Sequence, residues 1–173
     1  MHSLYFATET LGRPPLWDEL VQMWRADGPI KDMLGLPARR VVNEAAAAGH
    51  SQSDAQEAMW WRLGNAYYSS LRELYVLAVL REAGFPVEYH VIADALFRVD
   101  FWLGDIVISL FVANAQYRDG EGAGRKPSAR DIVGDCPAFS FVDMPRLTRH
   151  EYGTVHLPSK AEIQRFAAEY LGG

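Results

Sequence analysis

Hydrophobic positions in the first third of the chain repeat with the period of an α-helix. Between residues 15 and 27, apolar side chains recur at steps of three and four, at Leu16, Leu20, Met23 and Trp24. This stripe predicts an amphipathic helix that ends at Gly28-Pro29. A second, shorter helix is expected over residues 30–45, with interruptions at Gly35 and Pro37.

A longer helical pattern runs from Ser53 toward Ala83. Ser53 and Gln56 have the spacing of a capping box, and Gly84 is a typical C-terminal stop. The pattern leaves open whether the helix is broken near Gly64. The apolar face expected for it consists of Leu71, Leu74, Tyr75, Ala78 and Leu80.

The second half of the chain has the shorter apolar runs that are typical of strands. Two turn-like pairs, Ala93-Asp94 and Gly104-Asp105, separate three such runs, at residues 87–92, 96–103 and 106–112. We expect these runs to form an antiparallel meander. The third run is apolar on both faces, which predicts a central strand that is covered on both sides.

Two short helices and two further strands complete the expected elements. A helix is predicted over residues 128–133, and strands over 139–142 and 153–157. Ser159 and Glu162 have the spacing of a capping box that opens the last helix.

This order of elements predicts an α/β chain of the α+β kind. A helical N-terminal part is followed by a mixed central sheet that is flanked by helices. With 173 residues the chain suits a single domain. Within it we expect a helical extension over 1–54, a core over 55–145, and a C-terminal strand and helix over 146–173.

Composition narrows the classes of function. The chain has 17 basic and 22 acidic residues and a formal net charge of −5, so any contact with nucleic acid must come from a local basic patch. The lone cysteine, Cys136, excludes an internal disulfide and a cysteine-based zinc site. No apolar run has the length of a membrane span, and no leader-like segment opens the chain. We therefore expect a cytoplasmic protein without membrane association.

Two carboxylates are the candidate residues of a functional site. Asp100 lies at the first strand of the hairpin that turns at Gly104-Asp105, and Glu73 lies on the long helix before it. Each carboxylate also has an alternative interpretation without a functional role. In this interpretation Glu73 is a solvated helix residue beside Arg72, and Asp100 is the partner of a cation such as Arg98 on a half-exposed strand face.

This arrangement resembles the core of the PD-(D/E)XK, or restriction-endonuclease-like, nuclease superfamily. The resemblance covers residues 65–145 and rests on Glu73, on Asp100, and on the nine-residue step from Asp100 to Ser109. It implies a nuclease core in which Glu73 and Asp100 bind Mg²⁺ for the cleavage of nucleic acid. In the family, a Glu-x-Lys follows on the second strand; this chain has Ser109 and Phe111 at those positions.

The missing Glu-x-Lys removes one strong ligand and one base from the expected site. Mg²⁺ requires oxygen ligands, and a nearby lysine orients or deprotonates the nucleophile. Asp105 as a third ligand and Lys126 as a catalytic residue are the candidate replacements. The resemblance thus predicts a nuclease fold with a diverged, inactive metal site, or an Mg²⁺-dependent nuclease if these replacements act.

A glycine-rich segment after the hairpin carries the basic residues expected to contact nucleic acid. Phosphate contacts are predicted for Arg118, Arg125, Lys126 and Arg130, although an ordinary solvated loop is the alternative. Trp60 and Trp61 point about 100° apart on a helix, so only one can face a core. The other tryptophan is expected at an interface with a protein partner or a second copy of the chain, or on a base-stacking surface. A non-catalytic interaction protein on the same fold is therefore the alternative function.

Overall fold

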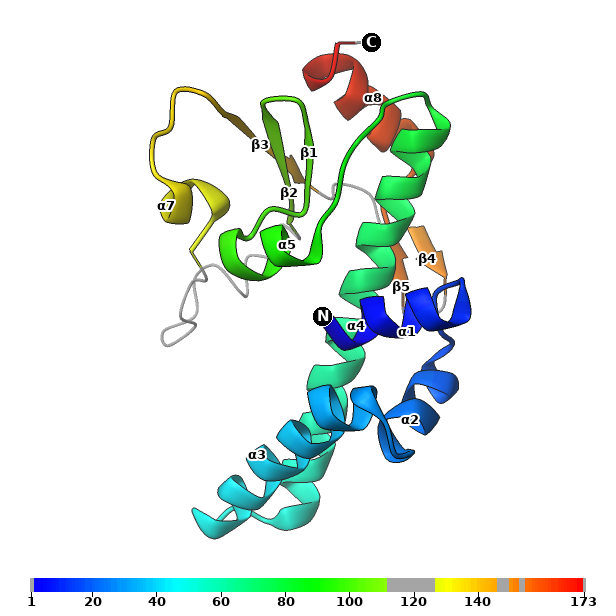
Figure 1. Ribbon diagram of the computed structural model, residues 1–173, viewed down its shortest axis with the longest axis vertical. Helices are drawn as coiled ribbons and strands as arrows, with labels where there is room; N and C mark the ends of the chain where they lie inside the picture. The colour runs from blue at the N-terminus through cyan, green and yellow to red at the C-terminus, as the bar shows by residue number, and fades with distance from the viewer. Residues whose placement is uncertain (1, 112–126, 146–149, 153–154, 173) are drawn as a thin grey trace. The chain divides into compact units, whose positions relative to one another are not determined.

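The computed structural model describes residues 2–111, 127–145, 150–152 and 155–172 (Figure 1). Over these residues the fold is α+β and mostly helical, with a three-stranded mixed sheet and a separate two-stranded sheet. The chain divides into two compact units, Met1–Leu71 (unit 1) and Arg72–Gly173 (unit 2). The division falls inside a long helix, whereas the sequence placed the end of the N-terminal extension at residue 54. A restriction-endonuclease-like core stays a prediction.

Unit 1 is helical. It contains α1 (His2–Leu11), α2 (Trp17–Arg25), a π-helix η1 (Lys31–Gly35) that continues into α3 (Leu36–Ala47), and the first part of α4 (Gln52–Glu82). The two helices expected over 15–27 and 30–45 are present, but Gly35 and Pro37 do not interrupt the second. Gly35 belongs to the π-helix, and Pro37 lies where the π-helix passes into α3, with both flanking residues in the α-helical conformation.

The core of unit 1 contains the buried residues Leu4, Ala7, Leu20, Ile30 and Tyr67. The Tyr67 hydroxyl donates a hydrogen bond of 2.8 Å to the Pro15 carbonyl oxygen, which ties α4 to the entry of α2. Trp60 packs against Trp17 and Trp24, with ring centroids 6.0 and 4.9 Å apart. Trp61, its neighbour, is 65% exposed, so only one of the pair lies at a helix contact, as expected.

Helix α4 runs without a break through Gly64, because a glycine inside a helix weakens it by only about 1 kcal/mol. It begins at Gln52, one residue before the expected cap, and the Ser51 hydroxyl is the one that approaches the Asp54 amide, at 3.5 Å. Its buried face in unit 2 also differs from the expected one. Ala78 is exposed, and the buried residues are Glu73, Val76, Leu77, Val79 and Leu80.

Unit 2 contains the sheet, in the order β1 (Phe101–Leu103), β2 (Ile106–Phe111) and β3 (Ser140–Pro145) (Figure 1). The expected hairpin is confirmed, since β1 pairs antiparallel with β2 across the Gly104-Asp105 turn. Strand β3 pairs parallel with β2, as a crossover through α7 (Ala129–Val133) permits. The central position of β2 is confirmed.

The first expected strand is wrong. Residues Val91–Phe97 form the helix α5, and only Glu88 makes a β-bridge, to Trp102. His90 caps α5 by accepting the Ile92 N–H at its Nδ1. Val87 of this run is buried in the sheet core, whereas Ile92 is exposed on α5. Leu96 and Phe97 of the second expected strand also belong to α5 and are exposed, so that strand begins only at Phe101. The antiparallel meander is therefore reduced to a hairpin.

Both faces of β2 are covered by apolar side chains. The first cluster, which we call the sheet core, contains Phe101, Ile108 and Met144 together with the end of α4 and with α8 (Lys160–Tyr170). The second, the α7-side core, contains Val99, Val107 and Ala129. Ser159 and Glu162 form the expected capping box of α8, and Ser128 caps α7.

The C-terminal part adds the hairpin of β4 (His150–Tyr152) and β5 (Val155–Leu157), so the strand expected over 153–157 is present at its end. None of the described helices combines the length and the apolar character needed to cross a membrane.

Candidate functional site

Asp100 is the centre of the candidate site. It directly precedes β1, and its Oδ2 accepts a hydrogen bond of 2.6 Å from the backbone N–H of Leu110 on β2. The hairpin pairs Phe101 with Ile108, so its register, extended by one residue, places Asp100 opposite Ser109. The nine-residue step seen in the sequence is therefore the step expected for cross-strand neighbours one residue beyond the last pair of the ladder.

The environment of Asp100 favours its neutral form. Burial is the largest effect and raises the pKa of this carboxyl group to about 7. The hydrogen bond from Leu110 acts in the opposite direction, because it stabilises the charged form. The negative charge of Asp94 raises the pKa further, and the positive charge of Arg98 lowers it. Asp100 is therefore a mixture of neutral and charged forms at neutral pH.

Helix α5 supplies the two charged neighbours of Asp100. Asp94 is buried in α5, and Arg98 follows the helix with φ 59°, a left-handed conformation that is uncommon for a residue other than glycine. The sequence indicated Arg98 as a neighbour of Asp100 but missed Asp94, because Ala93-Asp94 was interpreted as a turn between strands. His90 as a helix cap was the local signal that could have indicated α5.

Glu73 and Asp105 lie elsewhere in unit 2. Glu73 is 8% exposed, so its interpretation as a solvated helix residue is wrong. It shares the buried face of α4 with Val76 and Leu77, which belong to the sheet core. Asp105 is exposed at the hairpin turn, where its backbone carbonyl accepts the Ser140 N–H. Within the residues that the structure describes, no three histidine, cysteine, aspartate or glutamate side chains are grouped as metal ligands.

The two faces of the sheet also separate the expected ligands. Phe101 belongs to the sheet core, whereas Val99 and Trp102, on the two sides of Asp100, pack in or against the α7-side core. Asp94, whose charge acts on Asp100, follows Ala93, which also packs there, so Asp100 lies toward the α7 side. Glu73 is on the helix face that packs into the sheet core. This geometry gives no support to a cation shared by Glu73 and Asp100.

The residues around Asp100 do not fit Mg²⁺. This ion requires oxygen ligands in near-octahedral geometry and is usually held by ionised carboxylates. Asp100 is only partly ionised at neutral pH and already accepts a backbone hydrogen bond, and Ser109 replaces a carboxylate with a hydroxyl group. The catalytic and metal roles of Glu73, Asp100 and Asp105 stay predictions.

Of the basic residues expected to contact nucleic acid, the structure describes Arg130. It is exposed on α7, and its guanidinium lies 5.6 Å from the centre of the Phe141 ring. The other three residues, Arg118, Arg125 and Lys126, are outside the described residues.

The comparisons with known proteins complete the description of the site. Neither the family models, nor the curated proteins, nor the solved structures contain a match to this chain.

Proposed function

We propose that this chain binds nucleic acid through a nuclease-like core that does not cleave its ligand with Mg²⁺. The observation that carries the proposal is the hairpin, where Asp100 precedes β1 and Ser109 lies opposite it in register. The hairpin of β1 and β2, followed by α7 and a parallel β3, supports the proposal, although α5 takes the place of the first of the three strands expected after α4. The position that would complete a metal site holds a hydroxyl group.

Asp100 in this proposal has a structural role. Its carboxylate joins the segment before β1 to the backbone of β2, and its burial disfavours the charge that a metal ion would require. Binding is assigned instead to basic side chains near α7, of which Arg130 is exposed. Contacts to phosphate supply affinity without sequence specificity and are suited to a local patch on an acidic protein.

Fluorescence anisotropy with labelled single- and double-stranded DNA and RNA tests the binding. The affinity of the full chain is expected to fall as salt rises, because contact with phosphate releases counterions. Arg130→Gln is expected to weaken binding and to flatten the salt slope by about one unit. Arg165→Gln, which removes the same charge from an exposed position on α8, is the matched control. Equal losses in the two variants, or no binding at low salt, would overturn the proposal.

Cleavage is tested separately with Mg²⁺ and with Mn²⁺ on the same ligands. No cleavage above background is expected, and Asp100→Asn is expected to bind nucleic acid as the unmodified chain does. Metal-dependent cleavage that Asp100→Asn abolishes would show that other residues replace the missing ligands.

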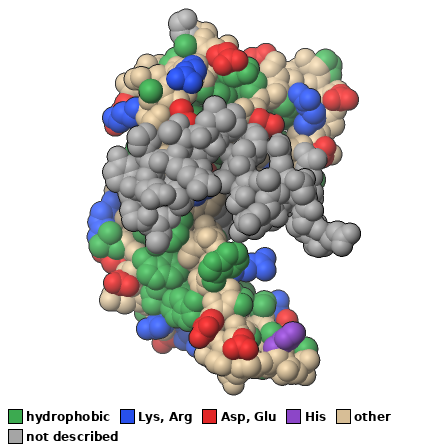
Figure 2. Space-filling model, turned by 180° about the vertical axis from the view of Figure 1, so that it is seen from behind, with side chains coloured by type: hydrophobic (Ala, Val, Ile, Leu, Met, Phe, Trp, Pro, Cys, Tyr) green, Lys and Arg blue, Asp and Glu red, His purple; other side chains and the backbone are tan. Residues whose placement is uncertain are grey.

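A second candidate function is self-association through unit 1. The observation that favours it is Trp61, a large aromatic side chain with 65% of its surface exposed. Hydrophobic side chains are gathered on the lower part of the molecule in Figure 2, with basic side chains beside them. Analytical ultracentrifugation of the chain and of Trp61→Glu tests it: a dimer that the variant dissociates supports this function, and a monomer at all concentrations removes it.

A further inference from the structure

Unit 1 contains a cavity of about 440 Å³ between α2, the π-helix, α3 and the start of α4. Its volume is in the range of small-molecule sites. Its wall has three kinds of side chain: basic, amide and apolar. The residues that the argument uses are Arg25, Lys31, Arg39, Asn43, Gln56 and Trp60. All of these belong to unit 1, so the cavity is independent of the nuclease-like core.

The charged groups of the lining are all positive. Arg25, Lys31 and Arg39 face the cavity, and no acidic residue lines it, although the chain as a whole has a net charge of −5. Lys31 forms an ion pair of 2.5 Å with Asp27, a residue outside the lining. Among the described residues, no ion pair involves Arg39 or Arg25. This concentration of positive charge suits an anion such as a phosphate group.

The apolar part of the lining is an aromatic surface in which Trp24 and Trp60 pack on each other and Arg25 packs on Trp60. The rings of Trp24 and Trp60 lie 4.9 Å apart at an angle of 32°, and the Arg25 guanidinium lies 5.7 Å from the centre of the Trp60 ring. Arginine and tryptophan together provide stacking surfaces for an aromatic ligand. The amides of Asn43 and Gln56 carry both donors and acceptors, which is what the polar edge of a heterocyclic base requires.

The backbone that forms the cavity has an unusual geometry. The π-helix contributes Lys31 and Gly35 to the lining, and π-helical turns are rare and frequent at functional sites. A Cβ atom at Gly35 would lie 2.7 Å from the carbonyl oxygen of Trp24. Glycine therefore permits the π-helix to approach the end of α2 closely, which fixes Lys31 and Trp24 on one wall.

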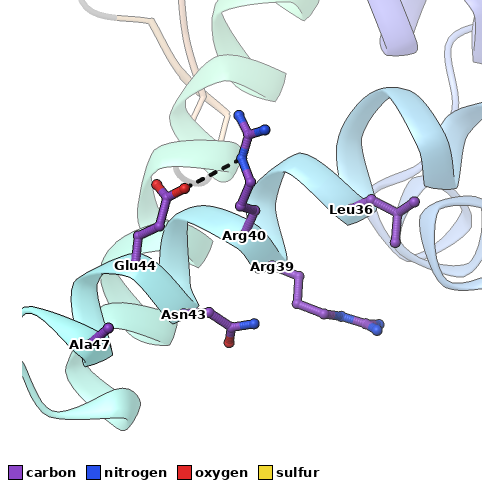
Figure 3. A pocket seen from close by; sticks show the side chains of 6 residues that line it. All are labelled: Leu36, Arg39, Arg40, Asn43, Glu44 and Ala47. Atoms are coloured by element: carbon purple, nitrogen blue, oxygen red, sulfur yellow. Dashed lines mark ion pairs between the residues drawn. The ribbon is translucent and has the colours of Figure 1, made fainter.

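Arg39 and Arg40 are consecutive in α3 but have different contacts, so they are a matched pair for experiments. Arg40 is paired with Glu44, with its Nε 3.5 Å from Oε1, and lines only a shallow depression beside the cavity (Figure 3). Arg39 points away from this pair and lines both the depression and the cavity (Figure 3). Both side chains belong to exposed residues and carry the same charge.

We propose that this cavity binds a nucleotide. The phosphate lies against Arg39, Arg25 and Lys31, and the base lies on the Trp24 and Trp60 side, where Asn43 and Gln56 contact its polar edge. The ligand is either a free mononucleotide or the terminal nucleotide of a single strand, since both present the same phosphate and base. This assignment does not rest on the function proposed for unit 2.

Isothermal titration of the full chain with AMP, GMP, CMP and UMP tests the proposal, with tryptophan fluorescence as a second readout. At least one of these nucleotides is expected to bind, with its nucleoside and inorganic phosphate each at least about tenfold weaker. Arg39→Gln is expected to weaken binding by about tenfold or more, because a hydrogen bond to a charged group is lost. Arg40→Gln is expected to stay within about twofold, because it leaves the cavity lining unchanged.

A single-stranded oligonucleotide with a 5′-phosphate distinguishes the two sources of the ligand. The site is assigned to a strand end if the oligonucleotide binds and the mononucleotides do not. In that case Arg39→Gln weakens the binding of the oligonucleotide and Arg40→Gln does not. Circular dichroism melting of both variants confirms that the fold is retained. Binding that the two variants weaken equally, phosphate that binds as tightly as the nucleotide, or no binding of any probe would overturn the proposal. Arg130→Gln leaves this site untouched, so its effect and that of Arg39→Gln are separable.

Discussion

At the scale of single residues, Asp100 makes the stability of the chain depend on pH. In the unfolded chain an aspartate has a pKa of about 4, and in the folded chain the pKa of Asp100 is raised to about 7, chiefly by burial. Between these values the folded state holds more protons than the unfolded state. The contribution of Asp100 to the free energy of unfolding is thus fully present below about pH 4 and is lost as the pH rises through 7.

Asp100→Asn is expected to remove this dependence. The amide oxygen can still accept the Leu110 N–H, and no charge has to be buried at high pH. Relative to the unmodified chain, the variant should gain roughly 1–3 kcal/mol in free energy of unfolding between pH 4 and pH 8. Urea unfolding at both pH values measures the gain. Asp105→Asn, at an exposed turn, is the control and should keep the original pH slope. Equal slopes in Asp100→Asn and the unmodified chain would contradict the prediction.

Trp60 and Trp61 give a second contrast at the residue scale. Trp60 contacts the rings of Trp17 and Trp24, whereas Trp61 is 65% exposed. Trp60→Ala is expected to lower the free energy of unfolding by on the order of 2 kcal/mol, because ring contacts and apolar burial are lost. Trp61→Ala should change it by less than about 0.5 kcal/mol. Chemical unfolding of both variants measures these changes in free energy of unfolding. A larger loss for Trp61→Ala than for Trp60→Ala would contradict the prediction and show that the Trp61 ring is covered in solution.

At the scale of elements, the π-helix depends on the absence of a side chain at Gly35. Gly35→Ala would bring a Cβ to 2.7 Å from the Trp24 carbonyl oxygen, so the backbone must shift. The expected cost is about 1–3 kcal/mol in free energy of unfolding. Gly64→Ala, in the interior of α4 with open space around the new Cβ, is expected to stabilise the chain by about 0.5–1 kcal/mol. Thermal melts that move in opposite directions support this account, and a stabilising Gly35→Ala would contradict it.

Helix ends and strands differ in how well local sequence predicts them. The cap at Ser159 forms as predicted, because a serine and an acidic residue three positions later satisfy each other's backbone amides, and Ser128 caps α7 in the same way. The cap predicted at Ser53 is wrong, since α4 begins at Gln52. The strand expected over 87–92 failed, because the chain enters the helix α5 at Val91 and Ile92 is exposed, although Val87 at the start of the run is buried. An apolar run is therefore not sufficient to predict a strand, because the same residues can lie exposed on a helix.

At the scale of the whole molecule, the cores of the two units are made of separate residues. Ile30 is buried in the core of unit 1 and Ile108 in the sheet core of unit 2. Ile30→Val and Ile108→Val should each cost about 1 kcal/mol in free energy of unfolding. Because the two clusters have no member in common among the described residues, the double variant should show the sum to within about 0.5 kcal/mol. A double-mutant cycle in urea measures this, and a coupling energy above about 1 kcal/mol would show that the two cores are energetically linked.

Features that depend on near neighbours in the chain could be predicted from the sequence. The amphipathic stripe of α2, the end of α4 before Gly84, the capping of α8 and the hairpin at Gly104-Asp105 all follow from residues a few positions apart. The hairpin also fixes the relation of Asp100 to Ser109, because a two-residue turn sets the register of its strands. The sequence therefore predicted the hairpin beside Asp100, and the role of Asp100 in a site stays a prediction.

Only the tertiary structure decided which groups surround these residues. Asp94 lies near Asp100 because α5 replaces an expected strand, and Glu73 is buried with the sheet core because α4 packs through a face other than the predicted one. The cavity of unit 1 likewise combines side chains from four separate elements. The periodicity of the sequence predicts which face of an element is apolar. The packing partner decides which face is buried and which charged groups are desolvated.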